Sequence, residues 1–86
     1  MAKKKPLDVE RLAEVRTNCA PLIEKMLGHG MSYELIAVKI GEYLSGINPS
    51  VQSVARWKKG TSIPTRAHGV ALLRTYEDIF ETGEEE

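Results

Sequence analysis

The side chains best suited to bind another molecule lie in one short stretch, residues 50–60. With about 100° of rotation per residue, a helix over this stretch separates an apolar side from a polar side. The polar side has no carboxylate, and its amide, hydroxyl and cationic groups can donate hydrogen bonds to base edges and phosphates. Two interpretations are open: a DNA recognition helix, or a core helix with an ordinary solvated face. The polar side holds Gln52, Ser53, Arg56 and Lys59; the apolar side holds Val51, Val54, Ala55 and Trp57, with Lys58 near its end.

The charges of the chain are unevenly distributed, although they sum to zero. No acidic residue occurs between Glu42 and Glu77, whereas that interval contains three arginines, two lysines and His68. The residues from Glu77 to the end are rich in glutamate instead. A basic block around one helix is the electrostatic footprint of a nucleic-acid-binding protein. The alternative is that these cations only solvate a helical bundle.

Length and composition bound the class of protein. A chain of 86 residues predicts one small domain. No apolar run approaches the roughly 20 residues of a membrane span, and the lysines at positions 3–5 are not followed by the apolar region of a signal peptide. The single cysteine, Cys19, excludes an internal disulfide and fits a reducing compartment. We therefore expect a cytoplasmic protein that does not contact membranes.

The sequence also lacks the usual signatures of catalysis. His29 and His68 have no cysteine or carboxylate at the spacing of metal ligands. There is no glycine-rich phosphate loop, and Cys19 has no activating partner that would make it a nucleophile. We predict that the chain is not an enzyme and has no cofactor, no metal site and no small-molecule ligand.

The elements that must position residues 50–60 begin with an N-terminal helical region. Residues 1–6 are predicted to be a disordered basic terminus. From Leu7 onward, apolar residues recur on one helical stripe, which Pro21 interrupts. Proline is tolerated at a first helical position but not in a helix interior. The region is therefore one kinked helix or two helices, the second over residues 22–27, and two are favoured. The stripe consists of Leu12, Val15, Cys19, Ile23 and Met26.

A second helical element is predicted to start after Ser32, which can cap it. Its apolar stripe runs through Gly41, so we expect the helix to extend to Leu44 and to end at Ser45–Gly46. Asn48 is a good cap and Pro49 a good first residue for the next helix. These features predict a three-residue turn over 46–48 and a following helix over about 49–59. The stripe holds Tyr33, Ile36, Ala37, Ile40 and Leu44.

A last helix is predicted after Pro64, with Thr65 as its cap. An acidic disordered tail is predicted over residues 82–86. The predicted fold class is all-α, with four to five short helices in a single domain over residues 7–81. The apolar face of the last helix holds Leu72, Leu73, Tyr76, Ile79 and Phe80.

Two segments resemble one known family. Residues 32–41 resemble the second helix of the Cro/CI-type (XRE-type) helix-turn-helix domains of bacterial and phage regulators, with the same capping hydroxyl, Leu/Ile-Ala pair and glycine. Residues 56–64 are similar to that family's pattern R-W-x-x-G-x-x-x-P, and their Arg-Trp-Lys-Lys start also resembles phage CII-type activators. The resemblance covers roughly residues 22–76. It implies a lambda-repressor-like fold, with a helix-turn-helix over about 32–60.

The sequence departs from the family at two places. The family has only a few residues between its glycine and the recognition helix, whereas residues 42–48 look inserted here. The longer second helix predicted above would absorb them. The family's frequent glutamine after the cap, which commonly contacts phosphate, is Tyr33 here, whose hydroxyl could take over that contact.

The resemblance implies base-reading residues at the start of the recognition helix: Ser50, Val51, Gln52 and Ser53, with Arg56 one turn on. Elementary chemistry agrees for most of them: Gln52 can bond bidentately to adenine, and Arg56 to guanine or to a phosphate. Val51 could touch a thymine methyl group or belong to the core, and Trp57 is expected in the core. The predicted phosphate contacts are Tyr33, Lys58, Lys59, Thr61, Ser62 and Arg66, with simple surface solvation as the alternative for Arg66 and His68.

The sequence thus predicts a transcriptional regulator that binds double-stranded DNA. One such helix reads few base pairs, so we expect a homodimer on two half-sites. The possible contact surfaces are the N-terminal helix, residues 76–80, and Leu35 with Val38, which lie off the apolar stripe. The alternative function is a protein-interaction module, an antitoxin-like or adaptor-like helical domain that uses the acidic tail.

Overall fold

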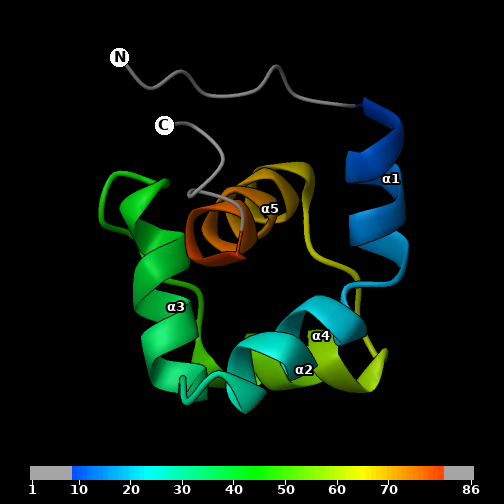
Figure 1. The fold of residues 1–86 in the computed structure, drawn as a ribbon. Helices are drawn as coiled ribbons and strands as arrows, with labels where there is room; N and C mark the ends of the chain where they lie inside the picture. Colours follow the sequence, from blue (N-terminus) through cyan, green and yellow to red (C-terminus); the bar gives the residue numbers. More distant parts are fainter. Residues whose placement is uncertain (1–8, 81–86) are drawn as a thin grey trace.

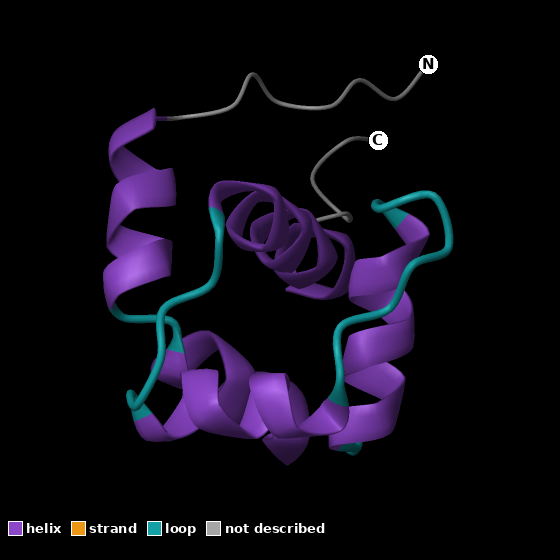
Figure 2. Ribbon diagram, turned by 180° about the vertical axis from the view of Figure 1, so that it is seen from behind, coloured by secondary structure: helices purple, strands orange, loops and turns teal. Residues whose placement is uncertain are grey.

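The computed structural model describes residues 9–80, and those residues form five α-helices and no strand. Figure 1 and Figure 2 show α5 in the centre, α1 and α3 on its two sides, and α2 with α4 across one end. The predicted all-α class is confirmed for this part of the chain. The predicted terminal segments 1–6 and 82–86 lie outside the described residues, as does Glu81. The helices are α1 (Val9–Thr17), α2 (Ala20–Gly28), α3 (Tyr33–Glu42), α4 (Val51–Lys59) and α5 (Arg66–Phe80).

The N-terminal region consists of two helices rather than one kinked helix. α1 ends at Thr17, and α2 begins at Ala20 with Pro21 in its first turn, where the missing N–H of proline is no loss. The favoured prediction is confirmed, although α2 begins two residues before the predicted position 22. All five residues of the predicted stripe are at most 4% exposed.

α3 begins as predicted but is shorter than predicted. The Ser32 hydroxyl accepts a hydrogen bond from the backbone N–H of Leu35 at 3.1 Å. The helix ends at Glu42, and the prediction that it extends to Leu44 is wrong. The backbone leaves the helix because Ser45 and Gly46 have positive φ, which lets the N–H of Gly46 bond to the carbonyl of Gly41. Leu44 still packs against the core from this turn, so it matches the stripe without being helical.

The connection between α3 and α4 covers residues 43–50, and the predicted three-residue turn over 46–48 is wrong. α4 begins at Val51, and its cap is Ser50 rather than Asn48. Asn48 instead lies against Gly41: a Cβ atom on Gly41 would come within 2.9 Å of the Asn48 Cα and still closer to its side chain. Gly41 is therefore required by a close approach, and Pro49 is buried rather than helical. Figure 2 shows this connection as a long loop beside α3.

The C-terminal end of α4 and the start of α5 agree with the predictions from the sequence. Gly60 ends α4 in the left-handed conformation, at φ 80°. The Thr65 hydroxyl caps α5 by accepting from the N–H of His68 at 3.2 Å. Val54 and Trp57 of α4 are buried in the same core as Leu72 and Leu73 of α5. This core fixes α4 against α2 and α3, which both pack on it.

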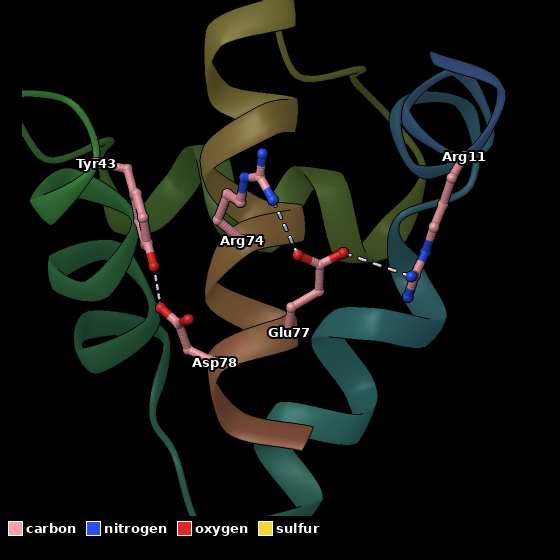
Figure 3. A network of polar contacts seen from close by, with 5 residues as sticks. All are labelled: Arg11, Tyr43, Arg74, Glu77 and Asp78. Carbon is pink, nitrogen blue, oxygen red and sulfur yellow. Dashed lines mark hydrogen bonds and ion pairs between the residues drawn. The ribbon is translucent and has the colours of Figure 1, made fainter. Parts of the chain in front are cut away.

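A polar network joins α1, the turn after α3 and α5 (Figure 3). Glu77 of α5 accepts from Arg11 of α1 at 3.5 Å and from Arg74 of its own helix at 3.4 Å. Asp78 accepts from the Tyr43 hydroxyl, which belongs to the turn after α3. The network therefore ties two segments that are distant in the sequence, α1 and the turn after α3, to α5. Within residues 9–80, no helix is long and apolar enough to cross a membrane.

Candidate nucleic-acid interface

The inner side of α4 is fixed by the core. Val54 is fully buried and Trp57 is 4% exposed, which confirms both as core residues. The Cys19 thiol donates to the carbonyl of Trp57 at 3.4 Å, so the start of α2 also holds the end of α4. Burial raises the pKa of the Cys19 thiol, which favours the neutral form. Cys19 is thus a small core residue, as predicted.

The outer side of α4 presents free hydrogen-bond donors. Gln52, Arg56 and Lys59 are exposed, and their spacing of four and three residues places them on one side of the helix. Within residues 9–80, their side chains have no hydrogen bond and no ion pair. The three groups span about 10 Å along the helix axis. This face can therefore meet an acceptor-rich surface without first breaking intramolecular contacts.

The first turn of α4 uses its hydroxyls for capping. The Ser50 oxygen accepts from the backbone N–H of Ser53 at 3.0 Å and also contacts the Ser53 hydroxyl at 2.9 Å. These two serines hold the helix start, so their predicted contact with bases would compete with the cap. Val51 is 40% exposed, outside the core, and is available to an apolar group. Among the predicted base-reading residues, Gln52 and Arg56 are the ones with uncommitted polar groups.

The predicted phosphate contacts fall into different environments. Lys58 pairs with Glu24 of α2 at 3.7 Å, and an exposed pair of this kind contributes only about 0.2–1 kcal/mol. Phosphate could therefore displace Glu24, although the carboxylate would remain nearby. The Thr61 hydroxyl donates to the carbonyl of Arg56 at 3.3 Å, and Ser62 is half-buried. Tyr33 is half-buried against the core at the start of α3.

Arg66 does not join the cations of α4. The His68 ring lies 5.4 Å from the Trp57 ring, so this side of α5 faces α4. Arg66 precedes His68 by two residues and lies on nearly the opposite side of α5, because each residue turns the helix by about 100°. Arg66 instead lines a groove of about 420 Å³ with Tyr43 and Arg74. Its contact with phosphate stays a prediction, and the geometry favours another role.

Sequence reasoning missed one residue that positions this interface. The Nε of Arg16, on α1, donates to the carbonyl of Pro64 at 3.1 Å. Its aliphatic stem crosses α5 at Gly69, where an added Cβ atom would lie 2.7 Å from the Arg16 Cγ. Arg16 thereby fixes the segment 60–65 that leaves α4. A glycine inside the otherwise regular last helix was the available signal, because glycine there costs stability unless a close approach requires it.

The interface has the chemistry of a binding surface. No acidic side chain lies on the outer side of α4, and the groups offered there are an amide, a guanidinium and an ammonium. In the part of the chain that the structure describes, no group of His, Cys, Asp or Glu residues could hold a metal ion. Neither a protein-family model, nor a curated protein, nor a solved structure matches the chain.

Proposed function

We propose that this chain binds double-stranded DNA sequence-specifically as a small transcriptional regulator, with α3 and α4 acting as a lambda-repressor-like helix-turn-helix. The observation that carries the proposal is the outer side of α4. Its inner side is held by a core, whereas Gln52, Arg56 and Lys59 are exposed without intramolecular partners. A rigid helix with free donors is what reading a major groove requires.

The proposed roles follow from hydrogen-bonding chemistry. Gln52 suits the N6 and N7 atoms of adenine, and Arg56 suits the O6 and N7 atoms of guanine. Val51 suits a thymine methyl group. Phosphate contacts would come from groups around this face and would orient the helix without specifying sequence. These groups are Lys59, Lys58 after release from Glu24, Ser62, Thr61 and the Tyr33 hydroxyl.

The resemblance to Cro/CI-type regulators supports the proposal, with one change. The connection in residues 43–50 is longer than that family's turn, yet α3 and α4 still pack against each other. The contact between Gly41 and Asn48 brings the chain back to α3 before α4 begins. The additional residues therefore form an excursion and need not separate the two helices.

The experiment is a selection of bound duplexes from a random pool, followed by titration of the selected duplex at several salt concentrations. We expect the affinity to fall steeply as salt increases, because bound cations release counterions from DNA. Arg56→Ala and Gln52→Ala should each weaken binding and relax the preference at one base position. Lys39→Ala is the matched control, since Lys39 is an exposed cation on the side of α3 that faces Thr75 and Asp78. No enrichment in the selection, or equal effects of all three variants, would refute the proposal.

A further inference from the structure

The groove beside α5 has a regular arrangement of charge. Arg66, Val70 and Arg74 are four residues apart, so they form one stripe along the helix, basic at both ends and apolar in the middle. Tyr43 and Leu44, in the turn after α3, form the other wall of this groove of about 420 Å³. Arg66 is exposed and has no ion pair within residues 9–80. The groove therefore has an uncompensated cation at one end and an apolar floor.

The outer side of α3 has the complementary arrangement. Glu34, Val38 and Glu42 are also four residues apart, so they form a stripe that is acidic at both ends and apolar in the middle. Both glutamates are exposed and have no ion pair in the described part of the chain. Val38 is 43% exposed, and Leu35 beside it is 41% exposed, so an apolar patch on this helix remains uncovered.

The two stripes match in length as well as in sign. In each, the charged ends are eight residues apart, which is about 12 Å along a helix, with a valine halfway between. Within one molecule the acidic stripe does not lie along the groove, because α3 packs in its own fold through the side where Ile36, Ala37 and Ile40 are buried. Only Glu42, at the end of the stripe, borders its own α5, near Thr75 and Asp78. An acidic stripe that filled the groove would therefore come from another molecule.

We propose that the groove beside α5 binds the outer side of α3 from a second copy of this chain, and that the contact is reciprocal. The charged ends would pair across the interface, and Val38, Leu35 and Val70 would be removed from water between them. A reciprocal contact between identical copies closes as a two-fold dimer. Arg66 is assigned to this interface rather than to phosphate. The association needs no DNA, so it can be true even if the proposed DNA binding is not.

The first test is sedimentation equilibrium of the purified chain without DNA, over a range of protein concentrations. We expect a reversible monomer–dimer equilibrium. Arg66→Glu should raise the dimer dissociation constant by at least about tenfold, because it replaces an attraction by a repulsion in both copies of the contact. A chain that stays monomeric at every concentration would overturn the proposal, and so would an Arg66→Glu variant that dimerises as well as the original.

The decisive test mixes charge-reversed variants. Glu42→Arg and Glu34→Arg are each expected to weaken self-association, like Arg66→Glu. In a mixture with Arg66→Glu, one of the two contacts of the heterodimer brings the introduced glutamate to the introduced arginine, provided that these positions face each other, and the other contact keeps the native Arg66 and the native glutamate. Glu42→Arg should form a heterodimer with Arg66→Glu if the helices are antiparallel, and Glu34→Arg should do so if they are parallel. If neither mixture forms a heterodimer, the proposal is overturned.

Two controls separate this interface from general effects of charge. Glu14→Arg makes the same change of charge on the exposed side of α1, and it should leave the dissociation constant unchanged. Circular dichroism of each variant should show the same helix content, since every substituted side chain is exposed. Equal weakening by Glu14→Arg would show that net charge, rather than the α3–α5 contact, controls association, and this result would refute the proposal.

Discussion

Arg56 and Arg74 have the same side chain, but they occupy two regions of the molecule that use it differently. Arg74 is 18% exposed and donates to Glu77, which Arg11 also contacts (Figure 3). Arg56 is exposed on α4 and has no side-chain partner within residues 9–80. The region around Glu77 supplies an acid to its cations, whereas the outer side of α4 does not.

This difference indicates that the cations near Glu77 serve the fold, whereas Arg56 and Lys59 on α4 remain available to a ligand. A guanidinium already bonded to a partly buried carboxylate has part of its charge compensated, so it attracts a further anion less strongly. A free, solvated guanidinium loses only water. The two regions should therefore respond differently to substitution: one through the free energy of unfolding, the other through affinity for DNA.

The largest expected effect comes from Arg56→Ala, which tests the binding side of the comparison. We expect the affinity for the selected duplex to fall by about 1–3 kcal/mol, because the proposed bidentate contact with a base is lost. The free energy of unfolding should change by less than about 0.5 kcal/mol, since the side chain is exposed. Fluorescence anisotropy and urea unfolding measure the two quantities. If Arg56→Ala lost much stability, the distinction between the outer side of α4 and the region around Glu77 would not hold.

Glu77→Gln tests whether the region around Glu77 stabilises the fold. The substitution removes the charge that two guanidiniums share, and we expect a loss of about 1 kcal/mol in the free energy of unfolding. The affinity for DNA should change little. Glu14→Gln, which alters an exposed glutamate of α1, is the control and should leave stability unchanged. Urea unfolding at low and high salt checks the prediction, and a variant as stable as the original would contradict it.

Arg16→Ala tests the residue that connects the two regions. We expect a loss of about 1 kcal/mol in stability, because the carbonyl of Pro64 loses its donor. Amide hydrogen exchange should become faster in residues 61–65, and the affinity for DNA should fall by roughly threefold as the segment after α4 loosens. Arg11→Ala breaks another contact between α1 and α5 and should leave exchange in residues 61–65 unchanged. If amide hydrogen exchange in residues 61–65 were similar in the two variants, Arg16 would not position this segment.

The smallest expected effect belongs to Glu24→Gln. Glu24 is the acid that pairs with Lys58 beside the proposed interface, at 3.7 Å. Its removal frees the ammonium group and eliminates a carboxylate near the phosphates, so affinity for DNA should rise by about twofold to threefold. The rise should vanish at high salt. Glu14→Gln again serves as the control, and a decrease in affinity would contradict the prediction.

Most of the fold could be predicted from local sequence patterns. The stripe through Ile36 and Ile40 and the hydroxyl caps at Ser32 and Thr65 depend only on residues within a few positions of each other, so the sequence predicts them directly. The connection after α3 was mispredicted because Leu44 reaches the core from a turn. The start of α4 was mispredicted for a second reason: Asn48 is a residue type that commonly caps helices, but here it packs against Gly41.

The candidate site was predictable to a similar extent. Periodicity placed Arg56 and Gln52 on the outer side of α4, and the structure confirms that they are exposed. It could not reveal that Ser50 caps the helix through Ser53, because that depends on where α4 begins. The contacts Lys58–Glu24 and Arg16–Pro64 join residues far apart in the chain, and no local pattern encodes them.

The close approach of Asn48 to Gly41 has a consequence for where the chain can accept inserted residues. It closes residues 42–47 into a loop whose two ends are held together by the fold. Doubling the length of such a loop costs only about 0.6 kcal/mol in closure entropy. An insertion after Gly46 would therefore lengthen the excursion into solvent and leave the starting point of α4 in place. We therefore expect this junction to tolerate an inserted peptide tag.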